Sequence, residues 1–212
     1  MLRRWLPIRD VVKRQITISH LCLEEGRMRQ YYFVSARLTE VKGIEWGVRG
    51  VTAAVRRGAD VQWDILGDGP LKGQLEALVR QIGMENVIHF HGSQPMPYVH
   101  EILDQSHLRM LPGIRAADGA EEALEGAVLE AQACDIPVLT TDAGGIAEGM
   151  VDGISGICVP QAEAGALADG LLTLIERRQE WPAMGRAGRQ HVASNYDCVR
   201  LNERWLSLYR SL

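Results

Sequence analysis

The chain has 212 residues, of which 46% are hydrophobic and 24% charged, so it can bury one sizeable core or two small ones. Its formal net charge is −4, from 23 basic and 27 acidic residues, which gives no reason to expect a nucleic-acid partner. The four cysteines lie far apart without a CxxC pair, which argues against zinc or thioredoxin-like chemistry and favours a reducing, cytoplasmic compartment.

The opening segment, residues 1–29, is predicted to be a flank or linker. It is basic, with Arg3, Arg4, Arg9, Lys13 and Arg14, but it lacks the apolar region of a signal peptide. A basic helix of this kind can rest on anionic lipid, so peripheral contact with the inner face of a membrane is an alternative to the solvated flank that we favour. No apolar run approaches the roughly 20 residues that a membrane-spanning helix needs.

From residue 30 onward, short β-branched or aromatic runs alternate with segments of helical periodicity. The strand candidates, in chain order, are YYFVSA, VQWDIL, VIHFH, LRML, PVLTT and ICV. Apolar residues at helical spacing mark the intervening helices at Ile44, Val48, Val51 and Val55, then at Leu71, Leu75, Leu78 and Ile82, and later at Leu167, Leu171 and Leu174.

Strands separated by helices need crossover connections, so the predicted fold class is α/β. We expect a doubly wound, Rossmann-like parallel sheet with helices on both faces, spanning residues 30–195. A C-terminal helix is expected over residues 196–212, where Leu201, Trp205 and Leu208 share a face.

The stretch ILGDGPLKG places three glycines between a predicted strand and a helix, close to the fingerprint of a nicotinamide-binding turn. That turn belongs after the first strand of its unit, but here it follows the second. The spacing from Gly67 through Gly69 to Gly73 is also one residue too long, and the next strand ends in His91 where the unit needs an acid for the ribose. We therefore interpret the glycines as a tight reversal into a helix, with Pro70 in its first turn.

The segment GAEEALEGAVLEAQACDIPVLTTDAGGIAEGMVDGISGICVP, together with SARLTEVKG and ILGDGPL, resembles the C-terminal half of the family 4 retaining glycosyltransferases. The resemblance covers residues 31–212, and its most specific element is the pair Glu122 and Glu130, separated by seven residues. It implies one half of a GT-B fold that binds a nucleotide sugar. The implied reaction transfers a hexosyl group from a nucleoside diphosphate sugar to an acceptor hydroxyl, in polysaccharide or glycan biosynthesis.

By this resemblance, Glu122 faces the transferred sugar and Glu130 faces the ribose of the nucleotide. The helix between them turns its free N–H groups toward the diphosphate, at Gly126, Ala127 and Val128. The spacing also argues against a glycosidase acid/base pair. Eight steps along an unbroken helix cover about 12 Å, whereas such pairs lie roughly 5 to 9.5 Å apart.

Arg37 and Lys42 occupy the positions at which the family pattern carries an arginine and a lysine that stabilise the leaving diphosphate. Both lie in the loop that leaves the strand YYFVSA, where a parallel sheet places ligands. The resemblance implies that this is done without a divalent metal, so no metal or other cofactor is expected besides the substrate itself. The alternative is a solvated RLTEVK turn, which we would prefer if this motif stood alone.

Two further pairs carry a structural and a functional interpretation. Gly144 and Gly145 are either a plain turn after the strand PVLTT or a close backbone approach near the sugar, and we rate these equally. His91 and Gly92 match the family's loop beneath the nucleotide base. However, His89 and His91 alternate in one strand, which is more typical of a packed or solvent-facing pair.

Several family positions differ in this chain. Ala123 stands where glycine is usual and Glu125 where glycine or proline is usual, and a glutamate beside a diphosphate adds like-charge repulsion unless it points outward. Aligning Glu125 and Gly126 with the family's EG would displace the assignment of Glu122 but not that of Glu130. Arg109 lies inside LRML, an awkward place for a charge unless it is paired.

We expect an N-terminal acceptor domain, in the same polypeptide or in a separate chain, to complete the enzyme. The 212 residues alone are expected to bind nucleotide but to transfer little or no sugar. A second hypothesis, motivated by Glu125, is a non-catalytic or degenerate GT-B half that acts as an interaction module with a separate acceptor-domain chain. A third, a related GT-B enzyme such as a sugar-nucleotide epimerase, is less favoured because GDGPL and GGIAE occur together.

Overall fold

The computed structural model describes residues 30–211, so the predicted flank 1–29 with its basic cluster lies outside the described residues. Six strands form one sheet in the order β3-β2-β1-β4-β5-β6, and every neighbouring pair is parallel. The strands are β1 (Gln30–Ser35), β2 (Val61–Leu66), β3 (Ile88–Gly92), β4 (Leu108–Leu111), β5 (Val138–Thr141) and β6 (Gly156–Val159). All six predicted strands are present, and the doubly wound parallel sheet is confirmed.

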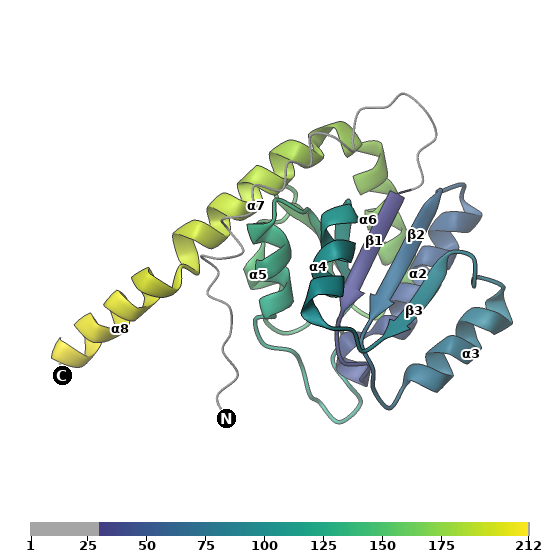
Figure 1. The fold of residues 1–212 in the computed structure, drawn as a ribbon, viewed down its shortest axis with the longest axis horizontal. Coiled ribbons are helices and arrows are strands. Elements are labelled where there is room, and N and C mark those ends of the chain that lie inside the picture. Colours follow the sequence, from purple (N-terminus) through teal and green to yellow (C-terminus); the bar gives the residue numbers. More distant parts are fainter. Residues whose placement is uncertain (1–29, 212) are drawn as a thin grey trace.

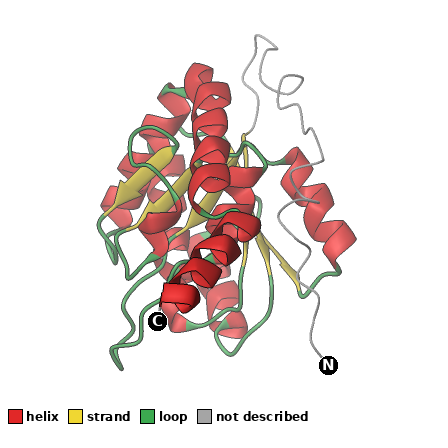
Figure 2. Cartoon of the chain, turned by 90° about the vertical axis from the view of Figure 1, so that its left-hand side faces the viewer, coloured by secondary structure: helices red, strands yellow, loops and turns green. Residues whose placement is uncertain are grey.

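Helices cover both faces of this sheet, as Figures 1 and 2 show. On one face, α2 (Ile44–Arg56) packs against α3 (Lys72–Ile82) and α6 (Ala164–Glu176). On the other, α5 (Gly126–Ala133) packs against α7 (Trp181–Asn195), and α4 (Met96–Gln105) contacts β1. The described residues also include three short 3-10 helices, η2 (Glu40–Lys42), η3 (Ile146–Gly149) and η4 (Arg178–Glu180).

The predicted apolar helix faces form much of the core. Ile44, Val48 and Val51 are buried on α2, while Val55 packs against the same core with part of its side chain exposed. The predicted face of α6 is also buried, at Leu167, Leu171 and Leu174. Because the strands between these helices are covered on both sides, buried apolar residues dominate β1, β2 and β4, although Asp64 and Arg109 are buried among them.

The helix α8 (Cys198–Ser211) differs from the others. It extends away from the sheet, and none of its residues is buried (Figures 1 and 2). It contains the predicted Leu201, Trp205 and Leu208, and five large apolar side chains on it are exposed: Val199, Trp205, Leu206, Leu208 and Tyr209. Across residues 30–211, no helix is both long and apolar enough to span a membrane.

The glycine turn after β2 lets two loops lie against each other. Gly67 has a φ of 132°, and a Cβ on it would lie 1.8 Å from the carbonyl oxygen of Ala36. The N–H of Leu38 donates to the carbonyl of Asp68 at 2.9 Å, and the N–H of Leu71 donates to that of Leu38 at 3.2 Å. The turn thus holds the loop that follows β1, in agreement with its interpretation as a tight reversal. The placement of Pro70 in the first turn of the helix was wrong, because α3 begins at Lys72 and Pro70 lies in the turn before it.

Candidate functional site

The strand order reverses between β1 and β4, because β1 leads to β2 on one side and β4 leads to β5 on the other. In open α/β sheets, ligands bind beyond the carboxyl ends of the strands at such a switch point. The loop after β1 (36–43) and the loop after β4 (112–125) flank this point. The first loop contains Arg37 and Lys42, and the second contains Glu122 and Glu125.

The side chain of Lys42 joins these two loops. Its Nζ lies 3.1 Å from Oε1 of Glu122 and donates a 2.6 Å hydrogen bond to Oε1 of Glu125. The three side chains are 14%, 25% and 10% exposed, respectively, so the contacts are largely shielded from water. Two of the predicted catalytic residues therefore meet, and Glu125 points inward to the same ammonium group.

Backbone contacts fix the position of Lys42. The turn η2 ends at Gly43, whose φ is 59° and whose missing Cβ would lie 1.8 Å from the carbonyl oxygen of Pro112. Nearby, the N–H of Ile114 donates to the carbonyl of Val41 at 3.0 Å. Because a side chain at position 43 would push the two loops apart, glycine is required here.

Gly144 and Gly145 support the loop that carries Glu122. Gly144 has a φ of 52°, and a Cβ on it would lie 2.1 Å from the carbonyl oxygen of Glu122. The N–H of Gly145 donates to the same oxygen at 3.0 Å. The close backbone approach is thus made to Glu122 itself, and a further contact with a sugar stays a prediction.

The helix α5 begins at Gly126, so the assumption of one unbroken helix from Glu122 to Glu130 was wrong. Glu125 is the N-cap residue, but its side chain does not cap the helix. A Cβ on Gly126 would meet no atom within 4 Å, which leaves open space beside the first turn. The N–H of the buried Val128 donates to the carbonyl of Glu125 at 2.9 Å, so Gly126 and Ala127 are the better candidates for binding an anion there.

The buried Arg109 on β4 was noticed in the sequence only as an awkward charge. Its side chain is among the most buried in the protein, and its guanidinium carbon lies 4.6 Å from the centre of the Phe33 ring. Burial lowers the pKa of Arg109, while the negative charges of Glu130 and Glu125 oppose that shift. A buried cation therefore interacts electrostatically with two carboxylates of the site, one of which is exposed Glu130 on α5.

Arg37 lies in the same loop as Lys42, and it is exposed. Its carbonyl accepts a 2.9 Å hydrogen bond from the N–H of Thr39. Within residues 30–211, its guanidinium forms no ion pair. The structure leaves this side chain available to a ligand, so its phosphate-binding role stays a prediction.

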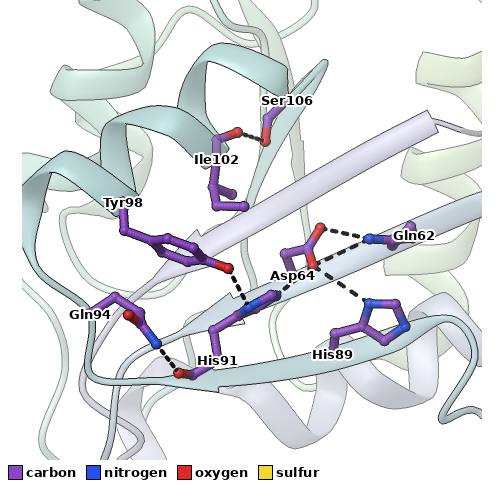
Figure 3. Close-up of polar contacts among 8 residues, drawn as sticks. All are labelled: Gln62, Asp64, His89, His91, Gln94, Tyr98, Ile102 and Ser106. Carbon is purple, nitrogen blue, oxygen red and sulfur yellow. Dashed lines mark hydrogen bonds and ion pairs between the residues drawn. The ribbon is translucent and has the colours of Figure 1, made fainter.

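His91 belongs to a polar cluster between β2, β3 and α4 (Figure 3). Its Nε2 lies 2.7 Å from Oδ1 of the buried Asp64, and its Nδ1 lies 3.0 Å from the hydroxyl of Tyr98. His89 approaches the same Asp64 oxygen at 3.7 Å. The imidazole of His91 is therefore a packed group with a partner on each nitrogen.

Gly92 continues from this cluster into the loop after β3. Its φ is 68°, and its carbonyl accepts a 2.8 Å hydrogen bond from the N–H of Gly67. The side chain of Gln94 donates to the carbonyl of His91 at 2.6 Å. These bonds hold the backbone at the tip of β3, and contact of His91 and Gly92 with a nucleotide base stays a prediction.

The sequence matches known proteins over most of its length. Residues 29–177 match the family model described as glycosyl transferases group 1. A candidate colanic acid biosynthesis glycosyltransferase of Salmonella typhimurium is 34% identical over 84% of this chain and 44% of that protein. An amylovoran biosynthesis glycosyltransferase of Erwinia amylovora is 30% identical over 76% of this chain and 40% of that protein. The chain spans less than half the length of these curated relatives.

Solved structures show the same fold. HepE of Anabaena, in complex with UDP, superposes with a TM-score of 0.75 at 21% identity, over 87% of this chain and 49% of that one. The C-terminal domain of a glycosyl transferase group 1 family protein of Francisella tularensis gives a TM-score of 0.68 at 21% identity, over 80% of this chain and 87% of that one. At these identities the likeness concerns the fold alone, and it confirms the predicted half of a GT-B architecture.

Proposed function

Because this chain belongs to the glycosyl transferases group 1 family, we propose that it is the donor-binding half of a retaining glycosyltransferase. It binds a nucleoside diphosphate sugar, whose hexosyl group passes to an acceptor hydroxyl. The observation that carries this proposal is the meeting of Lys42 and Glu122 at the switch point of the sheet. Their contact unites a cation and a carboxylate from loops that are about 80 residues apart in sequence, at the place where such sheets bind ligands.

Each group has a chemical task in the proposed reaction. When the bond between sugar and diphosphate breaks, negative charge develops on the departing nucleotide. The ammonium of Lys42 and the guanidinium of Arg37 stabilise that charge, and the free N–H groups at Gly126 and Ala127 add hydrogen bonds. The carboxylates of Glu122 and Glu130 accept hydrogen bonds from hydroxyls of the sugar and the ribose, respectively.

The relatives support a substrate class. HepE is solved with UDP, and the Salmonella and Erwinia relatives are named for colanic acid and amylovoran biosynthesis. By analogy, we assign this chain a role in making a polysaccharide or another glycan. An N-terminal acceptor domain, in the same polypeptide or in a separate chain, supplies the other wall of the catalytic cleft. We place the protein in the cytoplasm, with contact at the inner membrane face as the alternative.

Titration calorimetry of the 212-residue protein with UDP, GDP and ADP tests the proposal. We expect at least one diphosphate to bind, and Lys42→Ala to weaken that binding by about tenfold or more, since it removes a charge-assisted contact. Arg57→Ala is the matched control, because Arg57, which directly follows α2, forms an exposed ion pair with Asp169 of α6. Heat with none of the three nucleotides would favour the alternative of a non-catalytic interaction module.

A further inference from the structure

The ammonium of Lys42 is already neutralised without any ligand. It contacts two carboxylates, and the shorter contact, at 2.6 Å, is to Glu125 rather than to Glu122. The side chain of Glu125 is only 10% exposed, so its charge is held beside Lys42 with little screening by water. The carboxylate of Glu125 therefore occupies the position beside Lys42 that an incoming diphosphate would take.

The position of Glu125 is not explained by helix capping. Glu125 is the N-cap residue of α5, yet its side chain makes no capping hydrogen bond. It is also not needed to join the two loops, because the backbone contact between Val41 and Ile114 does so. The carboxylate instead pairs directly with Lys42, and its charge also acts on the buried Arg109.

Building on the proposed function, we propose that Glu125 is a resident counter-ion of Lys42 that determines which form of the nucleotide the site retains. The diphosphate displaces the Glu125 carboxylate from Lys42 when it binds. After transfer, the carboxylate returns to Lys42 and helps to expel the nucleoside diphosphate. Glu125 is thus a specificity-determining residue that disfavours the product relative to the donor.

The discrimination follows from charge. A free nucleoside diphosphate has a terminal phosphate with a single substituent, and the second ionisation of such a phosphate lies near pH 6, so it is mostly ionised at pH 7.5. The nucleotide sugar lacks this ionisation because the sugar esterifies the same phosphate. Coulomb repulsion scales with the product of the charges, so Glu125 repels the product more strongly than the donor.

The test compares the affinities of a nucleoside diphosphate and its sugar conjugate, UDP with UDP-glucose and GDP with GDP-mannose, by calorimetry at pH 7.5. The variants are Glu125→Gln, which keeps the shape, and Glu125→Ala, which removes the carboxyl group. Glu121→Gln is the matched control, because it removes the same charge from the same loop, but Glu121 faces Arg115 at 3.7 Å. Thermal unfolding of each variant confirms that it is folded.

We expect both Glu125 variants to tighten binding of the diphosphate by about tenfold and of the sugar conjugate by only about fivefold. Glu121→Gln leaves both affinities within about twofold, as expected for an exposed charge. Equal effects on the two ligands, unchanged affinities, or weaker binding by the Glu125 variants would each overturn the inference while leaving the proposed function intact. If neither the wild type nor any variant binds nucleotide, the proposed function fails as well.

Discussion

Gly145 donates its backbone N–H to the carbonyl oxygen of Glu122 at 3.0 Å, and its neighbour Gly144 lies beneath the same oxygen with a φ of 52°. The conformation of the glutamate loop therefore depends on a turn that follows a different strand, β5. This coupling makes the turn a sensitive point for both folding and ligand binding.

We expect Gly144→Ala to destabilise the fold by about 1 to 3 kcal/mol, because its Cβ would lie 2.1 Å from the Glu122 oxygen and its φ disfavours a side chain. Nucleotide binding should weaken as well, since the loop must move. Urea unfolding and calorimetry measure the two effects. Gly73→Ala is the control, because a Cβ there meets nothing within 4 Å, and an alanine in α3 should stabilise the helix by roughly 0.5 kcal/mol. Equal stability of the Gly144 variant and the wild type would contradict the structure of this turn.

The Asp64 carboxylate should contribute to stability through His91. Asp64→Asn removes the charge of a buried acceptor that lies 2.7 Å from the His91 ring (Figure 3), so we expect a loss of about 1 to 3 kcal/mol in the free energy of unfolding. Asp169→Asn, in an ion pair with Arg57 that is more than half exposed on both sides, should cost under about 0.5 kcal/mol. Chemical denaturation of both variants provides the comparison. Similar losses would show that the contact between Asp64 and His91 stabilises the fold no more than an exposed ion pair does.

The described cysteines should differ in reactivity. Burial raises the pKa of Cys134 to about 12 and that of Cys158 to about 11, whereas Cys198 is exposed. At pH 8, iodoacetamide should therefore modify Cys198 first and reach Cys134 only after unfolding, because the thiolate is the nucleophile. Mass spectrometry of peptides gives the order.

The raised pKa of Cys134 also predicts that stability falls as the pH rises from about 9 toward 12, since the unfolded chain then releases that proton more easily.

Removal of α8 should leave the domain folded. A chain that ends at Asp197 loses no buried residue, so its free energy of unfolding should change by less than about 0.5 kcal/mol. Urea denaturation of the full and shortened proteins tests this. A loss above about 1 kcal/mol would mean that the exposed apolar side chains of α8 contribute to the core, and that the predicted domain end near residue 195 is too early.

We expect the 212 residues to bind nucleotide without appreciable sugar transfer, because they span less than half the length of the curated relatives. Incubation with UDP-glucose or GDP-mannose and a mixture of simple acceptors, followed by chromatography of products, measures turnover. Efficient transfer to an acceptor by the pure chain would contradict this expectation, and with it the assignment of a half enzyme.

Periodicity predicted much of the fold because the helices α2 and α6 repeat apolar residues at helical spacing and the strands are short apolar runs. The start of α5 was not predictable, since Glu125 is not a usual N-cap residue and the helix lacks the Ser, Thr, Asp or Asn that marks such a start. The glutamate spacing also does not indicate that the side chain of Glu125 points inward, because its partner Lys42 lies in a different loop.

Contacts between side chains on different strands could also not be predicted from the sequence. Alternation placed His89 and His91 on one face, but their partner Asp64 comes from the register of β2 on β3, which pairs Asp64 with His89. The environment of Arg109 depends similarly on the pairing of β1 with β4, which sets it beside Phe33. The resemblance to a family singled out Lys42 and Glu122, whereas the contact between their side chains is seen only in the structure.

The strand order has a consequence for how the protein acquires its activity. During synthesis, β1, β2 and β3 can associate soon after they emerge, but β4 must then add to the far edge of β1 before the segment carrying Glu122 reaches Lys42. Contacts between such distant segments form late and slowly. In a nascent or partly folded molecule the proposed nucleotide site is therefore incomplete, and we expect nucleotide affinity to appear only after the central strand pairing has finished.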